Sequence, residues 1–109
     1  MLKIKKNATD CRLVFPSHKK HKILFFHGDV TIISDIKTAL SETYNHFGRI
    51  DIVFTNAGIH HSNSILDITE EEWDEVININ LKGSVFTVKE SIPYLSKNSG
   101  ESKVILMGS

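Results

Sequence analysis

Asp51-Ile52-Val53-Phe54-Thr55-Asn56-Ala57-Gly58 is the stretch of sequence that decides the fold. The apolar residues from Ile50 to Phe54, interrupted by one Asp, have the length and β-branching of a buried parallel strand. The run continues directly into Asn56-Ala57-Gly58, where a small residue and a glycine let another group approach the backbone closely. Because ligands of an open parallel sheet bind just past the carboxyl ends of its strands, we expect a ligand site here.

Two further apolar runs and one amphipathic pattern flank this strand. Ile23–Phe26 predicts a buried strand closed by His27-Gly28-Asp29-Val30, and Lys103–Met107 predicts another buried strand. Between Thr31 and Gly48, apolar residues recur at three- and four-residue steps. This pattern predicts a helix with Thr31 as its N-cap and Gly48 as its stop.

The longest predicted helix covers residues 70–95. Thr69 and Glu72 have the spacing of a capping box, and the acidic first turn suits the positive end of the helix dipole. Pro93 is expected to kink or end the helix near its last turn. The pattern predicts that its inner face consists of Trp73, Val76, Ile77, Asn80, Leu81, Ser84, Val85, Val88, Ile92 and Leu95.

The order strand, helix, strand, helix, strand predicts a βαβαβ unit, hence an α/β fold with parallel strands and right-handed crossovers. We assign residues 23–109 to this domain. Residues 1–22 form a poorly defined N-terminal segment, in which Cys11–Phe15 suits a short strand that Pro16 would end.

Composition excludes several classes of protein. The 109 residues carry 13 basic and 13 acidic side chains, so no net field draws the chain to nucleic acid or to an anionic membrane. The single cysteine, Cys11, allows no intrachain disulfide and no cysteine metal cluster. No apolar run approaches the ~20 residues that span a bilayer, and Met1–Lys6 lacks the apolar stretch of a signal peptide. We therefore expect a cytoplasmic protein.

Two histidine pairs raise a metal hypothesis. His18 and His21 stand in a basic run without a third ligand nearby, and a solvated loop explains them better. His60 and His61 lie in a polar loop predicted over residues 59–67, where solvent exposure or contact with a substrate is the ordinary role. No metal site is predicted.

Asn80 and Ser109 each admit two interpretations. Asn80 falls among apolar residues of the predicted inner helix face, where an amide without a partner would cost ~1–3 kcal/mol. It is either a core asparagine bonded to backbone or a functional group. Ser109 follows a predicted strand, a position that is typical of a turn residue as well as of a site residue.

The motifs together resemble the short-chain dehydrogenase/reductases. They are Asp29-Val30, Phe47–Asp51, Thr55–Gly58, Asn78–Gly83 and Val104–Ser109, in this order and at suitable spacing. The resemblance covers about four-fifths of the chain and implies an incomplete, doubly wound Rossmann-like fold. It also implies an oxidoreductase that transfers hydride between NAD or NADP and a carbonyl or alcohol.

The resemblance implies roles at the matching positions. Asp29 would accept the amino protons of the cofactor's adenine, with Val30 packed beside the ring, and Asn56, Ala57 and Gly58 would border the ribose and nicotinamide. Asn80 matches the asparagine that interrupts its helix and orders a proton-relay water. Ser109 matches the serine that hydrogen-bonds the substrate oxygen. Thr55 departs mildly from the family's commoner asparagine.

Two parts of the family pattern are missing from these residues. The catalytic Tyr with Lys four residues later is absent, because Gly48 follows Tyr44 and Asn98 follows Tyr94 at that spacing. The catalytic Tyr and Lys are expected beyond Ser109. The six glycines never form the clustered loop that seats the pyrophosphate. We therefore expect weak or no dinucleotide binding, and no turnover, by this chain alone.

Other interpretations remain open at this stage. The chain could be a non-catalytic interaction module, or a vestigial product, that forms homo-oligomers through helix 70–95. Its glycine loop and Tyr/Lys pair could also be encoded in flanking sequence. The sequence leaves the substrate and the choice between NAD and NADP undetermined.

Overall fold

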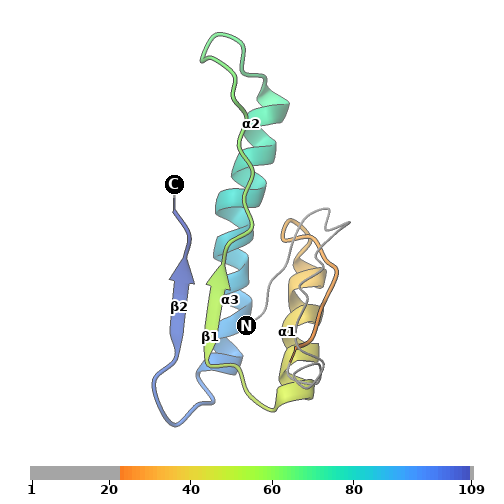
Figure 1. The fold of residues 1–109 in the computed structure, drawn as a ribbon, viewed down its shortest axis with the longest axis vertical. Coiled ribbons are helices and arrows are strands. Elements are labelled where there is room, and N and C mark those ends of the chain that lie inside the picture. Colours follow the sequence, from red (N-terminus) through yellow and green to blue (C-terminus); the bar gives the residue numbers. More distant parts are fainter. Residues whose placement is uncertain (1–22, 109) are drawn as a thin grey trace.

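The structure, a computed structural model, describes residues 23–108 (Figure 1). The predictions on Cys11–Phe15, His18 and His21 therefore lie outside the described residues. In chain order the elements are α1 (Ile33–Phe47), β1 (Ile52–Thr55), α2 (Glu70–Val76), the π-helix η2 (Ile77–Lys82), α3 (Gly83–Leu95) and β2 (Lys103–Leu106). Helices and parallel strands alternate, so the predicted α/β class is confirmed.

β1 and β2 lie side by side and point the same way (Figure 1). The register pairs Ile52 with Lys103 and Thr55 with Leu106, as a parallel crossover connection requires. α3 packs against both strands and against α1. The main core lies between these elements and consists of Ile36, Leu40, Ile50, Val53 and Leu95.

α2, η2 and α3 follow one another as a single long helical run (Figure 1). The predicted capping box is confirmed: Glu72 N–H donates to Thr69 Oγ1, and Thr69 N–H donates to the Glu72 carboxylate. Pro93 lies inside α3, which ends two residues later at Leu95, as expected.

The predicted inner face of the long helix is largely wrong. Trp73, Leu81, Val85 and Ile92 are exposed, whereas the buried positions recur every four residues: Ile79, Gly83, Thr87, Ser91 and Leu95. The small residues of this stripe allow close packing, since a Cβ built on Gly83 would lie 2.8 Å from Val30 Cγ2. Burial of the two hydroxyls costs little free energy, because the Thr87 hydroxyl donates to the Gly83 carbonyl and the Ser91 hydroxyl donates to the Val88 carbonyl.

Three other local predictions need correction. Ile23–Phe26 is not a strand, because within the described residues β1 pairs only with β2 and no strand lies beside this run. β2 is exposed along its whole length rather than buried. Thr31 is not the N-cap of α1; Ile32 takes that position, and the Thr31 hydroxyl donates to Asp29 instead. The stop at Gly48 is confirmed, with φ at 80°.

No helix among residues 23–108 combines the length and apolar character needed to cross a bilayer.

Candidate functional site

The turn after β1 is held by the π-helix. Asn80 Oδ1 accepts the Ile59 N–H at 2.9 Å, and Asn80 Nδ2 donates to the Ile59 carbonyl at 2.8 Å. The amide thus replaces the partner that Ile59 would have in a sheet. Asn56, Ala57 and Gly58 lie between β1 and this anchor. A Cβ built on Gly58 would be 3.4 Å from Asn80 Oδ1, so the glycine permits this approach.

Asn80 sits where the helix widens into π geometry. At the end of η2 the Gly83 N–H donates to the carbonyl of Asn78, five residues earlier. The Asn80 carbonyl accepts the Ser84 hydroxyl at 2.9 Å. Asn80 is exposed, so its predicted inward position is wrong, but both ends of its amide bond to backbone. Short π segments inside α-helices frequently occur at functional sites.

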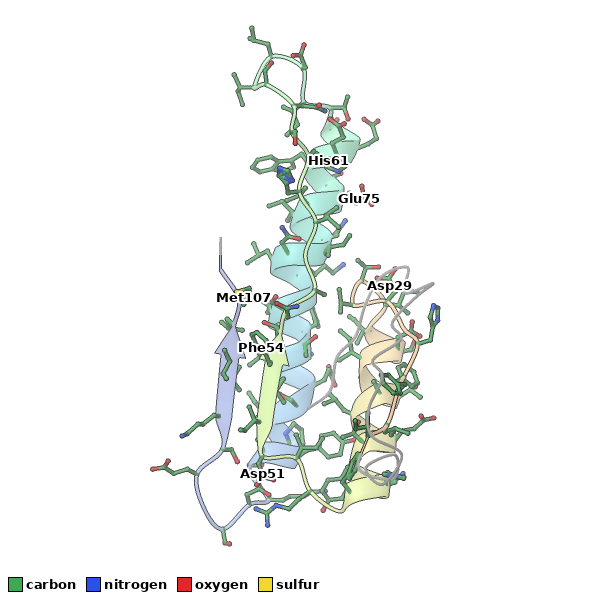
Figure 2. The ribbon with its side chains drawn as sticks, viewed as in Figure 1. Asp29, Asp51, Phe54, His61, Glu75 and Met107 are labelled. Carbon is green, nitrogen blue, oxygen red and sulfur yellow. The ribbon has the colours of Figure 1, made fainter. Side chains whose placement is uncertain are left out.

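Asp29 lies on the α1 side of the molecule, at about the level of Met107 (Figure 2), and hydrogen bonds fix its side chain. Its Oδ1 accepts both the N–H and the hydroxyl of Thr31 at 2.8 Å, and its own N–H donates to Asp35 at 2.9 Å. Val30, which follows, is buried against Gly83. The Asp29-Val30 segment is thereby packed directly on the long helix.

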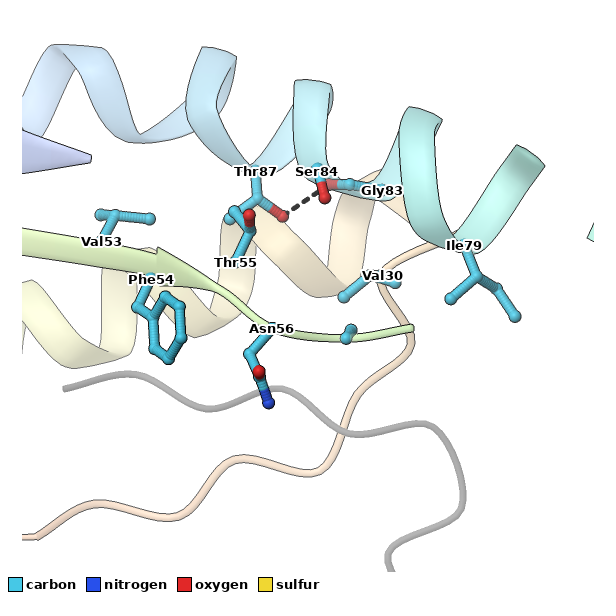
Figure 3. A pocket seen from close by; sticks show the side chains of 10 residues that line it. Val30, Val53, Phe54, Thr55, Asn56, Ile79, Gly83, Ser84 and Thr87 are labelled. Atoms are coloured by element: carbon cyan, nitrogen blue, oxygen red, sulfur yellow. Dashed lines mark hydrogen bonds between the residues drawn. The ribbon is translucent and has the colours of Figure 1, made fainter. Parts of the chain in front are cut away.

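A pocket opens between the end of β1, Val30 and the helix (Figure 3). Its cavity volume is about 30 Å³. Its lining residues are Val30, Val53, Phe54, Thr55, Asn56, Ala57, Ile79, Gly83, Ser84 and Thr87. Thr55 is only 7% exposed, and its hydroxyl has no hydrogen-bond partner within the described part of the chain.

The candidate residues that the structure describes fall into one region. Val30, Asn56 and Ala57 line the pocket; Asp29 adjoins Val30, and Gly58 contacts Asn80. Ser109 lies outside the described residues. Their assigned roles in cofactor binding and catalysis stay predictions.

The polar loop after the turn is also anchored to the helix. His61 Nε2 lies 3.2 Å from Glu75 Oε2, and both are labelled in Figure 2. Asn63 donates to both carboxylate oxygens of Glu72. The Thr69 N–H and then the Asn63 amide lower the pKa of Glu72 below its usual range. Residues 23–108 contain no cluster of three or more potential metal ligands.

Sequence reasoning missed three residues of this region. Ile59 serves as backbone anchor, and Gly83 and Thr87 bring the helix onto the strand. The signal for the last two was present as small residues at four-residue steps, Gly83, Thr87 and Ser91. The backbone role of Ile59 has no signature in its side chain.

Comparisons with known proteins agree on one family. The family model described as short chain dehydrogenase matches residues 2–109. An uncharacterized oxidoreductase from Staphylococcus epidermidis is 42% identical over 71 residues, which cover 65% of this chain and 31% of that protein. Tetrahydroxynaphthalene reductase from Pyricularia oryzae is 32% identical over 106 residues, 97% of this chain and 32% of that protein. The chain spans about a third of the length of these relatives.

A solved structure shares the fold. A crystal structure described as short-chain dehydrogenase/reductase SDR, glucose/ribitol dehydrogenase, from Brucella melitensis matches with a TM-score of 0.76 at 24% identity. The match covers 82% of this chain and 36% of that one. The family match along nearly the entire chain, with the π-helix asparagine anchoring the turn after β1, leads to one conclusion: the chain belongs to the short-chain dehydrogenase/reductase family.

Proposed function

We propose that this chain forms part of an NAD(P)-dependent oxidoreductase that acts on a small carbonyl or alcohol substrate. The observation that carries the proposal is the double hydrogen bond between Asn80 and Ile59, which joins the Asn56–Gly58 turn to the helix. This anchor gives the turn one fixed position at the carboxyl end of β1, where ligands of parallel sheets bind. We place the protein in the cytoplasm.

The residues present suit one part of the dinucleotide. The Asp29 carboxylate, oriented by Thr31, is an acceptor of the kind that suits an exocyclic amino group. Gly58 has no side chain to project from the turn, and it lies close to the Asn80 amide. The 109 residues contain no glycine cluster for the pyrophosphate, so binding to this chain alone is expected to be weak or undetectable. NAD and NADP remain equal candidates.

The nicotinamide, when bound, donates or accepts the hydride. Asn56, Ala57 and Gly58 would border its ribose, and the interrupted helix at Asn80 would hold the water of a proton relay. Ser109 would hydrogen-bond the substrate oxygen. Without a Tyr and Lys pair in these residues, the general acid/base is missing, a loss of ~10²–10⁴-fold in rate. We therefore expect no turnover by the purified chain.

A chimera in which a relative supplies the rest of the domain tests the proposal. The third of the Pyricularia oryzae reductase that this chain matches is replaced by residues 2–109. The proposal expects oxidation of NADH or NADPH with a carbonyl substrate, above a Ser109→Ala chimera. A folded chimera that oxidises neither dinucleotide with a panel of ketones would contradict it.

A second candidate function is association through the long helical run of residues 70–95. One side of this run, along η2 and α3, exposes Leu81, Val85 and Ile92, at 57%, 54% and 54% of their surface. An apolar stripe of this kind favours burial against a partner, and a second copy of the helix is the simplest one.

Sedimentation of the purified chain and its variants tests whether the chain associates in this way. Val85→Asp should convert an associating chain to monomer, whereas Ile65→Asp, at another exposed apolar side chain, should not. A monomer in the unaltered chain at high concentration would exclude the association.

A further inference from the structure

Another cavity lies between α1 and α3, which pack side by side (Figure 1). Its volume is about 440 Å³, within the ~300–1,000 Å³ that is usual for small-molecule sites. Its lining includes Lys37, Thr38 and Ser41 of α1, Glu90 and Tyr94 of α3, and Lys97, which follows α3. None of these residues lines the pocket beside β1, so the two sites are separate.

Lys97 is held in place by two aromatic rings. Its Nζ lies 4.5 Å from the ring centre of Tyr44 and 5.4 Å from that of Tyr94, within the range of cation–π attraction. The two ring centres are 5.2 Å apart, and both rings pack against the main core. An ammonium group that the fold already positions loses less conformational freedom when it binds a ligand.

Lys37 supplies a second positive charge, from the other helix. Its Nζ lies 4.0 Å from Glu90 Oε2, and Lys89 Nζ lies 3.7 Å from Glu90 Oε1. One carboxylate is thus shared between two ammonium groups and can neutralise the charge of only one. The carboxyl end of α3 adds about half a negative charge. The three lysines, Lys97 included, outweigh both, so the cavity attracts anions.

The hydroxyl groups of the cavity present acceptors rather than donors. The Thr38 hydroxyl donates to the Ser34 carbonyl at 2.9 Å, and the Ser41 hydroxyl donates to the Thr38 carbonyl at 3.0 Å. Each hydroxyl has a single proton, so its remaining capacity is to accept a hydrogen bond. A ligand that suits the whole cavity therefore combines negative charge, for the lysines, with O–H donors, for Thr38 and Ser41.

We propose that the cavity between α1 and α3 binds a soluble phosphate monoester that carries hydroxyl groups, such as a sugar phosphate. Lys37 and Lys97 donate charge-assisted hydrogen bonds to the phosphate oxygens. The sugar hydroxyls donate to Thr38 and Ser41. This site goes beyond the proposed oxidoreductase activity, because it uses none of the residues assigned to the dinucleotide or the substrate.

Titration of the full 109-residue chain, followed by its amide NMR shifts, tests the proposal. Glucose 6-phosphate is the probe, and glucose and inorganic phosphate are the controls. Glucose 6-phosphate should shift the amides of Thr38, Ser41 and Lys97 to saturation. Inorganic phosphate has no sugar hydroxyls and should bind at least ~3-fold more weakly, and glucose should cause no saturable shift.

Substitution of the charged residues gives the test a direction. Lys37→Gln and Lys97→Gln should each weaken the binding of glucose 6-phosphate about 5-fold, because each removes a charged hydrogen-bond donor. Glu90→Gln should strengthen this binding, because it removes the carboxylate that repels the phosphate. Lys103→Gln, in β2 and outside the cavity, should leave the affinity unchanged.

The unaltered chain can overturn the proposal by itself, if glucose 6-phosphate causes no saturable shift at the three amides. Equal affinity in folded Lys97→Gln and Lys103→Gln variants would reduce the binding to unspecific attraction by surface charge and would overturn it as well. A folded Glu90→Gln variant whose affinity is not increased would contradict the assigned balance of charges and reject the site.

Discussion

Asn80 holds the backbone of Ile59 with both ends of its side-chain amide, at 2.9 Å and 2.8 Å. The two residues are 21 positions apart, and the contact joins the π-helix to the turn that follows β1. A loop that leaves a strand normally has solvent as its backbone partner, which leaves its position loosely defined. Here an asparagine in a widened helical turn fixes that position.

Asn80→Ala should release this turn. Two hydrogen bonds are lost at an exposed site, so the expected loss of unfolding free energy is about 1–2 kcal/mol. The Ile59 amide should exchange markedly faster in the variant while the β1–β2 amides keep their rates. Asn78→Ala, on the same π-helix, is the control. Equal exchange of Ile59 in both variants would show that the amide does not anchor the turn.

Gly83→Ala should separate the long helix from the Asp29-Val30 segment. The added Cβ would lie 2.8 Å from Val30 Cγ2 and 3.1 Å from Val30 Cβ, so one side must move, at a cost of about 1–3 kcal/mol. Urea unfolding measures this cost. Gly100→Ala, which meets nothing within 4 Å, should change stability little.

Val30→Ala provides the second half of that experiment. In the double variant Gly83→Ala with Val30→Ala, the new methyl group occupies space vacated by the valine, so part of the lost stability should return. Strictly additive effects of the two substitutions would mean that this contact is not what limits helix packing.

Acidification should weaken the start of α2 through Glu72. Hydrogen bonds from Thr69 and Asn63 lower its pKa in the folded chain below the unfolded value. The contribution is therefore complete above the unfolded pKa and is lost as pH falls through the folded pKa. Unfolding free energy of Glu72→Gln should depend less on pH below about pH 5 than that of the unaltered chain. Glu71→Gln, whose carboxylate has no such partners within the described residues, should retain the dependence.

The sequence predicted elements whose signals are local. The capping box at Thr69 and Glu72 and the stop at Gly48 depend on residues within one helical turn, and both are present. The β1 strand was likewise evident from a short β-branched run that ends in a glycine turn. The family motifs correctly identified the family.

The errors arose where burial depends on partners. The face of α3 was assigned by hydrophobicity, yet Thr87 and Ser91 satisfy their hydroxyls within the helix and pack inward because they are small. Ile23–Phe26 has strand-like residues, but a strand exists only beside another strand. Neither outcome follows from the local sequence, because each depends on what lies opposite in space.

The central claim of the proposed function is that Asp29 contacts the adenine of a bound dinucleotide and that the Asn56–Gly58 turn borders its ribose and nicotinamide. Equilibrium titration of the chimera with NADH and NADPH tests it most directly. We predict that the chimera binds at least one of them, that Asp29→Asn weakens this binding about 10-fold through loss of a charged hydrogen bond, and that Asp67→Asn leaves it unchanged. Unchanged affinity in a folded Asp29→Asn chimera, or a folded chimera that binds neither dinucleotide, would contradict the account.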